Sequence, residues 1–309
     1  QDFTTGSWSV FSPQARFISI NAGRFDATKH QALSVIGDAR ESLVEVGAAL
    51  GSWRADANWM QRATDEYAHW NEMVAAATRP TNTNVPSYAQ VVGVANKVAG
   101  ERDLALTAAG GFPGELCKNW QVKSPGTFDC EFGFSCMGYE IAGAWGAKMA
   151  DESRDVIAFI GDGSYLMMNS EIVTSIQEDY KLTVVLVDNS GFASIGALSR
   201  SVGSDGFGTQ YRYRKDGSIG LDSERERGDV LPVDLATNAE SLGAQVLRTR
   251  NIADLRDALA EAKRVDRTVV IHIPVDRYEG VPSYESFWDV PVAEVSELKS
   301  VDAARRDDE

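Results

Sequence analysis

Two short polar segments in the middle of the sequence carry residue types that can bind a metal ion. The first is GDGS at residues 161–164, and the second is DNSG at residues 188–191. Asp162 offers carboxylate oxygens, Asn189 an amide oxygen and Gly191 a backbone carbonyl oxygen. Mg²⁺ prefers oxygen ligands of these kinds and usually completes its octahedron with phosphate oxygens and water. The two segments therefore predict a magnesium site.

The same segments could also hold a phosphate group. A glycine at position 163 lets the backbone approach a phosphate closely, and the amides of Gly163 and Ser164 can point toward it. Either segment alone, at the end of a strand, is common turn chemistry. Their joint occurrence at the ends of two neighbouring strands favours a site for a metal diphosphate.

The stretch of residues 155–195 provides those two strands. Residues 156–160 and 182–187 are short apolar runs, rich in β-branched side chains and bounded by polar residues or glycine, as is typical of buried parallel strands. A helical pattern at residues 169–177 lies between them, which gives a strand–helix–strand unit. Ligands of an open α/β sheet bind outside the carboxyl ends of its strands, where both polar segments fall.

Alternating strand and helix patterns continue on both sides of this unit. Further strands are expected at residues 104–108, 245–248 and 268–274, and helices at residues 88–99, 141–150, 233–242 and 252–262. The alternation predicts an α/β fold built on a doubly wound parallel sheet with helices on both faces.

The sequence also allows predictions for two glycine-rich segments, for one histidine and for the C-terminal residues. Residues 110–115 form a glycine-rich loop at the end of a strand, and residues 201–214 form a glycine-rich, aromatic cover or substrate contact. His272, inside an apolar strand, is expected to be a core histidine with a satisfied hydrogen bond. The charged residues 302–309 are expected to be disordered.

The first fifty residues read as the end of a separate domain. They contain strand patterns at residues 16–21 and 32–36 and a helix at residues 39–49 that Asp38 caps. A piece of this size could not bury its own apolar faces well. It is therefore expected to pack either on something absent from this chain or on the domain that follows.

Composition excludes several classes of partner. The chain has 309 residues, a net charge of −15 and a pI near 4.7, which argues against nucleic acid and anionic membranes as partners because both need basic patches. No apolar run approaches the length of a transmembrane helix. The three cysteines are odd in number and have no CxxC spacing, so we expect reduced thiols in a cytoplasmic protein, without a disulfide framework or zinc site.

GDGS with the later asparagine resembles the thiamine diphosphate (ThDP) motif. More narrowly, residues 161–214 and FSCMGYEIAGAWGAKMA at residues 134–150 resemble the trihydroxycyclohexane-1,2-dione hydrolase family of inositol breakdown. That family carries a pyrimidine-binding, a middle and a diphosphate-binding domain. The resemblance covers nearly the whole chain and begins partway through the middle domain.

The resemblance implies a division of the chain into four parts. Residues 1–53 would be the C-terminal part of the middle domain, and residues 54–86 a linker helix and linker. Residues 87–275 would be the domain that binds ThDP diphosphate and Mg²⁺, and residues 276–309 a C-terminal tail.

The resemblance also implies roles for individual residues. Met137 matches the large apolar residue that lies under the thiazolium ring and bends ThDP into a V. Ser135 stands where many relatives have a glycine, whose backbone carbonyl accepts a hydrogen bond from the pyrimidine amino group. The expected cofactor-binding residues are Ser135, Met137, Gly163, Ser164, Asn189, Phe192 and Ala193, and the expected Mg²⁺ ligands are Asp162, Asn189 and Gly191.

The implied activity is a ThDP- and Mg²⁺-dependent hydrolysis that opens a cyclic 1,2-diketone derived from a polyol, to a 5-deoxyglucuronate-type product. The glutamate that activates ThDP comes, in the family, from the pyrimidine-binding domain of a neighbouring subunit, and no match to that domain occurs here. It is therefore expected on a longer polypeptide or a second subunit, within a homodimer or tetramer. If the chain acts alone, Glu115 or Glu131 would have to serve instead.

Two other classes of function remain open at this point. One is a different ThDP enzyme, such as an acetolactate-synthase-like carboligase or a 2-oxoacid decarboxylase. The other is a non-catalytic subunit that retains the fold, although the intact GDGS and DNSG segments argue against a decayed site.

Overall fold

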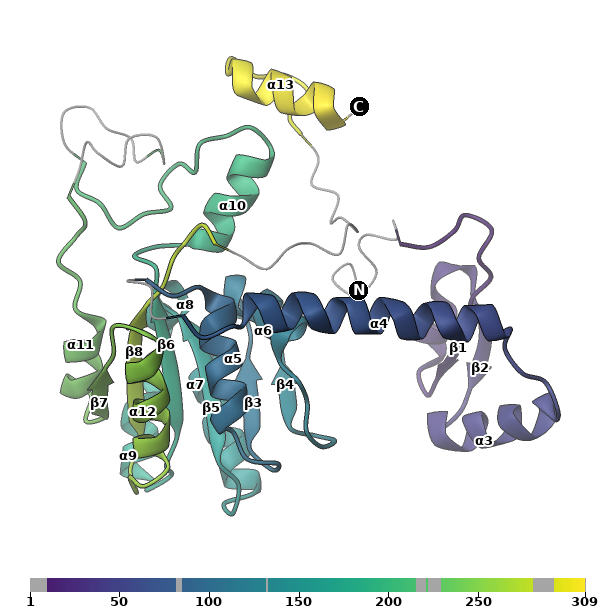
Figure 1. Ribbon diagram of the computed structural model, residues 1–309, viewed down its shortest axis with the longest axis horizontal. Coiled ribbons are helices and arrows are strands. Elements are labelled where there is room, and N and C mark those ends of the chain that lie inside the picture. The colour runs from purple at the N-terminus through teal and green to yellow at the C-terminus, as the bar shows by residue number, and fades with distance from the viewer. Residues whose placement is uncertain are drawn as a thin grey trace. The chain divides into compact units, whose positions relative to one another are not determined.

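The computed structural model describes residues 10–81, 85–131, 133–214, 221, 229–279 and 292–308. The chain falls into two compact units, one that extends to Glu72 and a larger one that begins at Met73. Helix α4 (Ala57–Ala77) crosses this boundary (Figure 1). Within the described residues, no helix has both the length and the apolar character required to cross a lipid bilayer.

The smaller unit is a strand pair with short helices. Strands β1 (Ile18–Asn21) and β2 (Leu33–Ile36) pair in parallel. The remaining elements are α2 (Arg24–Ala27), the 3-10 helix η1 (Lys29–Gln31) and α3 (Ala39–Leu50). The Asp38 carboxylate accepts the amides of Arg40 and Glu41, which confirms the predicted cap. Among described residues 10–72, only Ala27 is fully buried, so this unit leaves its apolar side chains largely exposed.

The larger unit is organised around a six-stranded parallel sheet with the order β4-β3-β5-β6-β8-β7. The strands are β3 (Leu104–Thr107), β4 (Phe128–Cys130), β5 (Val156–Gly161), β6 (Thr183–Asp188), β7 (Gln245–Arg248) and β8 (Val269–Pro274). The chain runs from β3 outward to β4 and then returns to the opposite side of β3 as β5. The topological switch point of the sheet, where such folds bind ligands, therefore lies between β3 and β5.

Two apolar cores cover the two faces of this sheet. One core contains residues of α5 (Tyr88–Val98), α6 (Gly111–Asn119) and α12 (Ile252–Ala262). The other contains residues of α7 (Tyr139–Ala150), α8 (Asp162–Met167), α9 (Glu171–Gln177) and α11 (Leu235–Ser241). Phe159 of β5 belongs to the first core and Ile160 to the second, as the alternation of a strand buried on both faces requires. The sheet, with its helices on both faces, confirms the predicted fold class (Figure 1).

Helix α6 corrects the loop predicted at residues 110–115. The helix begins at Gly111, and its Phe112 and Leu116 are both buried against the sheet. Four residues separate these two side chains, so they share one helix face. Burial of that face stabilises a helix that its glycines disfavour.

Disorder was predicted over residues 302–309, and helix α13 (Lys299–Asp308) corrects it over residues 302–308; Glu309 lies outside the described residues. Asp302 lies in its first turn, and Arg305 and Arg306 lie in its last turn. Charges placed in this way interact favourably with the helix dipole. A short helix, α8, also follows β5 directly where the sequence predicts a turn.

Candidate cofactor and metal site

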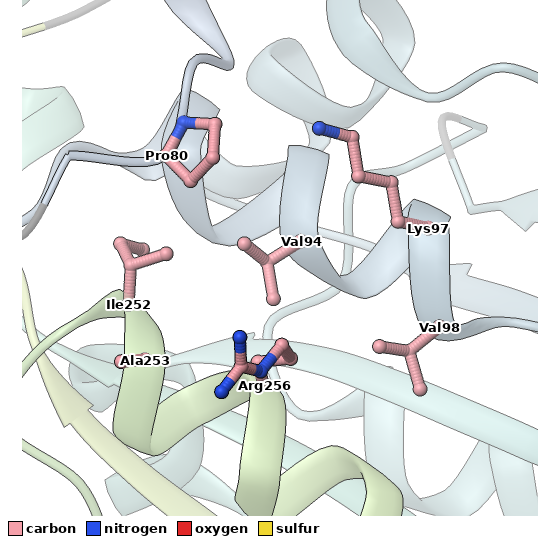
Figure 2. Close-up of a pocket in the computed structure, with 7 residues that line it drawn as sticks. All are labelled: Pro80, Val94, Lys97, Val98, Ile252, Ala253 and Arg256. Carbon is pink, nitrogen blue, oxygen red and sulfur yellow. The ribbon is translucent and has the colours of Figure 1, made fainter.

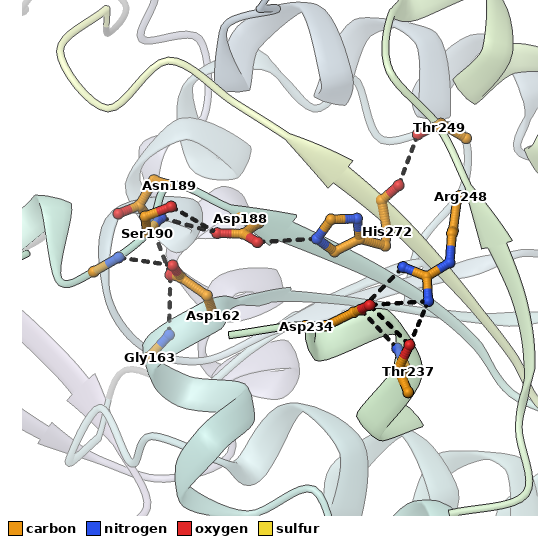
Figure 3. Close-up of polar contacts among 11 residues, drawn as sticks. Asp162, Gly163, Asp188, Asn189, Ser190, Asp234, Thr237, Arg248, Thr249 and His272 are labelled. Carbon is orange, nitrogen blue, oxygen red and sulfur yellow. Dashed lines mark hydrogen bonds and ion pairs between the residues drawn. The ribbon is translucent and has the colours of Figure 1, made fainter. Parts of the chain in front are cut away.

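The sheet brings the two polar segments together at its carboxyl edge. Gly161 of β5 pairs with Val187 of β6, so the residues that follow these strands are neighbours. The Asp162 carboxylate is buried and accepts three hydrogen bonds, from the Gly163 amide at 3.0 Å, the Asn189 side-chain amide at 3.1 Å and the Gly191 amide at 2.8 Å (Figure 3). The structure thus brings the three expected metal ligands into one cluster.

The side chain of Asn189 leaves one oxygen without a partner. Its Nδ2 donates to Asp162 and, at 2.8 Å, to the hydroxyl of Tyr88. Among the described residues, its Oδ1 is buried and has no hydrogen-bond partner. An unsatisfied buried polar atom costs about 1–3 kcal/mol, and a bound cation would remove that cost.

Two carboxyl groups, those of Asp162 and Asp188, lie close together at this point. Burial raises the pKa of Asp162 to about 7, and the nearby Asp188 carboxylate adds to the effect. Asp188 is held by His272, whose Nε2 lies 3.0 Å from its Oδ2, and by the Ser190 amide at 2.9 Å. Burial disfavours ionisation of Asp188, but these hydrogen bonds hold its pKa below the ordinary value. Two adjacent carboxyl groups in a buried position favour a cation.

The ligand set is not built from several acidic or imidazole side chains. Among the described residues, no group of three or more His, Cys, Asp and Glu side chains could hold a metal. The candidate set instead combines one carboxylate, one amide oxygen and one backbone carbonyl. Such a set leaves about half of an Mg²⁺ octahedron to phosphate oxygens and water, as a metal diphosphate requires.

The two glycines of the site are required by the protein's own packing. A Cβ on Gly163 would lie 2.6 Å from the ring of Phe192, and a Cβ on Gly191 would lie 2.1 Å from the Thr209 carbonyl oxygen. The Phe192 amide donates to that same oxygen at 2.8 Å. The segment around Thr209 therefore folds back on the DNSG segment.

The remaining expected cofactor residues lie near the ends of α7 and α10 (Ala193–Ser201). Ser135 has a left-handed backbone (φ +54°), which is the conformation that favours glycine, the residue many relatives carry there. Met137 is half-buried and precedes Gly138, the N-cap of α7. Ala193 is buried in the first turn of α10, directly after Phe192.

Several residues of the site were missed in the sequence. Tyr88 reads there only as the start of a helix, yet its hydroxyl contacts Asn189. His272 has a satisfied hydrogen bond, as predicted, but its partner is the residue next to Asn189. Glu140 is a fully buried carboxylate. Its sequence signal is a carboxylate beside the apolar and small residues of α7 that follow it, from Ile141 to Ala147.

The two glutamates named as possible activating acids have structural partners. Glu115 lies in α6 and accepts from the Asn119 side chain at 3.3 Å. Glu131 accepts the amides of Phe134 and Cys136, each at 2.8 Å, which lowers its pKa. Glu131 therefore acts as a tether of its own loop.

A separate pocket with a volume of about 470 cubic ångström (Å^3) lies between α5 and α12 (Figure 2). Its lining residues are Pro80, Val94, Lys97, Val98, Ile252, Ala253 and Arg256. None of the expected site residues contributes to it.

The fold and this edge of the sheet define a ThDP-binding domain. Residues 108–273 match the family described as thiamine pyrophosphate enzyme, C-terminal TPP binding domain. The match covers more than half of the chain, and the chain belongs to this family.

The chain is also similar to a narrower group of enzymes. It is 37% identical over 329 residues to the 3D-(3,5/4)-trihydroxycyclohexane-1,2-dione hydrolase of Bacillus anthracis (strain CDC 684 / NRRL 3495). It is 36% identical over 334 residues to the hydrolase of the same name from Bacillus thuringiensis (strain Al Hakam). Each alignment covers 98% of this chain and 50% of the relative. The chain thus spans about half the length of the curated relatives it matches.

A solved structure shares the fold at lower similarity. The benzoylformate decarboxylase from Polynucleobacter necessarius matches with a TM-score of 0.50 and 19% identity, over 62% of this chain and 33% of that one. Identity at this level supports the fold alone.

Proposed function

We propose that this chain holds the Mg²⁺–ThDP of an enzyme that hydrolyses a carbon–carbon bond in a cyclic 1,2-diketone. The observation that carries the proposal is 36–37% identity over 98% of the chain to relatives named trihydroxycyclohexane-1,2-dione hydrolase. The proposed substrate is a trihydroxycyclohexane-1,2-dione formed in inositol breakdown, and the proposed product is a 5-deoxyglucuronate.

The donor set at the carboxyl edge fits the metal part of this cofactor. Asp162, Asn189 and the Gly191 carbonyl would hold Mg²⁺. The clearest support is the buried Asn189 Oδ1, which has no hydrogen-bond partner among the described residues. The Asn189 Nδ2 donates to Asp162, so this hydrogen bond holds the side chains of two proposed ligands together.

ThDP supplies a nucleophilic carbon and an electron sink for cleavage of the bond next to a carbonyl. The residues of this chain would bind and orient it: the metal ligands hold the diphosphate end, and Met137 supports the ring that reacts. Phe192 and the segment at Thr209 would limit access of water to this edge, since they pack directly over Gly163 and Gly191.

A second protein surface is proposed to complete the site. Several apolar side chains near the candidate cofactor are exposed: Phe134, Leu166, Met167, Met168 and Ile195. Gly138 and Met168 are in contact range, since a Cβ on Gly138 would lie 2.5 Å from that of Met168. We propose that a pyrimidine-binding domain covers this surface and brings the activating glutamate, from the same polypeptide or from another subunit.

The test uses the full-length protein that contains this chain. Purified protein with ThDP and Mg²⁺ is incubated with the cyclic diketone, with pyruvate and with benzoylformate, and the products are identified by mass spectrometry. Ring opening of the diketone is expected, with little turnover of the two 2-oxoacids. Turnover of a 2-oxoacid alone would overturn the proposed substrate, and an intact mass of the active preparation would identify a second polypeptide.

A further inference from the structure

A buried carboxylate is hydrogen-bonded to the GDGS segment of the candidate cofactor site but is not one of the proposed metal ligands. Glu140 occupies the first turn of α7 and is fully buried. Its Oε1 accepts the Ala109 amide at 3.2 Å, and its Oε2 accepts the Gly138 amide at 2.9 Å. The Ser164 hydroxyl donates to both oxygens at 2.9 Å.

These three contacts come from three different segments of the sheet edge. Ala109 follows β3, Gly138 caps α7, and Ser164 belongs to the GDGS segment after β5. The chain leaves β3 toward α6 on one face, and it leaves β5 toward α8, whose Tyr165 belongs to the core on the other face. Glu140 therefore joins the two sides of the switch point between β3 and β5.

The partners of Glu140 match an ionised carboxylate. Both amides are donors, and the Ser164 hydroxyl donates to Glu140 while it accepts the Gly138 amide at 2.8 Å. Burial raises the pKa of Glu140, and these hydrogen bonds oppose that rise. A carboxylate in the first turn of α7 also interacts favourably with the helix dipole.

This arrangement decides what Ser164 can offer to a ligand. A hydroxyl has one proton, and that of Ser164 is directed to Glu140. The Gly138 amide is likewise directed to Glu140 and to the Ser164 oxygen. A diphosphate at this edge would therefore contact the backbone of the GDGS segment. The spacing between that segment and Met137 is set by Glu140, which binds both Gly138 and Ser164.

We propose that Glu140 is a positioning residue for the cofactor: its carboxylate fixes the segment after β3, the turn at Met137–Gly138 and the GDGS segment relative to one another. The proposal rests on the proposed function in one respect, namely that this edge binds Mg²⁺–ThDP. It assigns Glu140 no contact with the cofactor.

The test is Glu140→Gln in the full-length protein. Glutamine has nearly the same shape, but its NH₂ group must face either the Ala109 or the Gly138 amide, donor against donor. We expect ThDP affinity in the presence of saturating Mg²⁺ to fall about tenfold or more, as the mispairing of a buried donor predicts. The near-UV circular dichroism of bound ThDP should also change, because Met137 shifts relative to the GDGS segment.

Two controls separate this inference from the proposed function. Glu152→Gln removes the same charge at an exposed position just after α7 and should leave ThDP affinity and the spectrum unchanged. If the unmodified protein does not bind Mg²⁺–ThDP, the proposed function fails. If it binds and Glu140→Gln binds equally well with the same spectrum, the positioning role alone is overturned.

Two further variants keep the test decisive. Ser164→Ala combined with Glu140→Gln should weaken binding less than the sum of the single effects, because both act through one hydrogen-bonded unit. Fully additive effects would instead indicate a direct contact of the Ser164 hydroxyl with the diphosphate and overturn the inference. If Glu140→Gln does not fold, Glu140→Asp decides: its shorter carboxylate cannot reach all three donors, so unchanged ThDP affinity would contradict the proposal.

Discussion

The Asn189 side-chain amide donates to the Asp162 carboxylate across 3.1 Å, although 27 residues separate the two in the sequence. The contact exists because each residue follows one of two adjacent parallel strands whose carboxyl ends are in register. Helices α8 and α9 lie between these strands in the chain, and their Tyr165 and Ile172 pack in the core on one face of the sheet. The two proposed metal ligands thereby lie at the carboxyl edge of the sheet, on the β5 side of the switch point between β3 and β5.

Asp162→Ala should abolish the joint binding of Mg²⁺ and ThDP, because it removes the one carboxylate among the proposed metal ligands. Calorimetric titration with ThDP at fixed Mg²⁺ measures the loss, which should exceed about a hundredfold in affinity, or roughly 3 kcal/mol. The matched control is Asp266→Ala, at an exposed position before β8. An affinity equal to that of the unmodified protein would refute the metal assignment.

Tyr88→Phe should weaken Mg²⁺ binding about tenfold or more, as the loss of a residue that orients a metal ligand typically does. The Tyr88 hydroxyl accepts a hydrogen bond from the Asn189 Nδ2 at 2.8 Å. Removal of this hydroxyl would allow the side-chain amide of Asn189 to rotate. The ring itself still packs edge-on against Phe112, so the fold should be retained. Mg²⁺ titration at fixed ThDP is the measurement.

The control for this variant is Tyr165→Phe. Tyr165 is also buried, and its hydroxyl donates to Asn238 at 2.8 Å on the opposite face of the sheet. It should lose stability but not Mg²⁺ affinity. Equal effects of the two substitutions on Mg²⁺ affinity would mean that Tyr88 has no orienting role.

Gly163→Ala should destabilise the fold by about 1–3 kcal/mol, the usual range for an overpacked site. The added methyl group would lie 2.6 Å from the Phe192 ring, which must move. Chemical denaturation reports the change. Gly146→Ala, in α7 with no atom within 4 Å of the added methyl group, should instead stabilise by about 0.5–1 kcal/mol through helix propensity. Similar stability changes for both variants would contradict the predicted clash.

Asp234→Ala should reduce stability by about 1 kcal/mol, mainly through loss of the helix cap. The Asp234 carboxylate accepts the Thr237 amide at 2.8 Å and lies 2.9 Å from an Arg248 guanidinium nitrogen (Figure 3). The Arg248 hydrogen bond, with those from Thr237, holds the pKa of Asp234 well below its ordinary value of 3.8.

The sign of the pH dependence follows from that shift. A carboxyl group with a lowered pKa in the folded state contributes stability that is present above about pH 4 and is lost as the pH falls further. The difference in free energy of unfolding between Asp234→Ala and the unmodified protein should therefore shrink as the pH falls below about 4. A difference that stays constant over this range would show that the carboxylate charge has no part in the cap.

Elements with a strong local sequence pattern could be predicted without the structure. The predicted strand at residues 245–248 and helix at residues 252–262 have the same bounds as β7 and α12, because their periodicity and caps are local properties. The metal ligands could be proposed for the same reason: each follows a recognisable strand end. Helix α6 was missed because its stability comes from burial of Phe112 and Leu116 against a sheet that a local pattern does not show.

The contacts between distant side chains could not be predicted from local patterns and became visible only in the folded chain. Tyr88 meets Asn189 across 101 residues, and Asp188 meets His272 across 84. In the sequence, Glu140 is only an acidic residue in the first turn of a helix, and the folded chain places Ala109 and Ser164 around it. Strand order and register set these contacts, and both depend on the packing of the whole sheet. The residue types at the site could thus be predicted from the sequence. Their contacts with one another depend on the strand order and register of the complete parallel sheet.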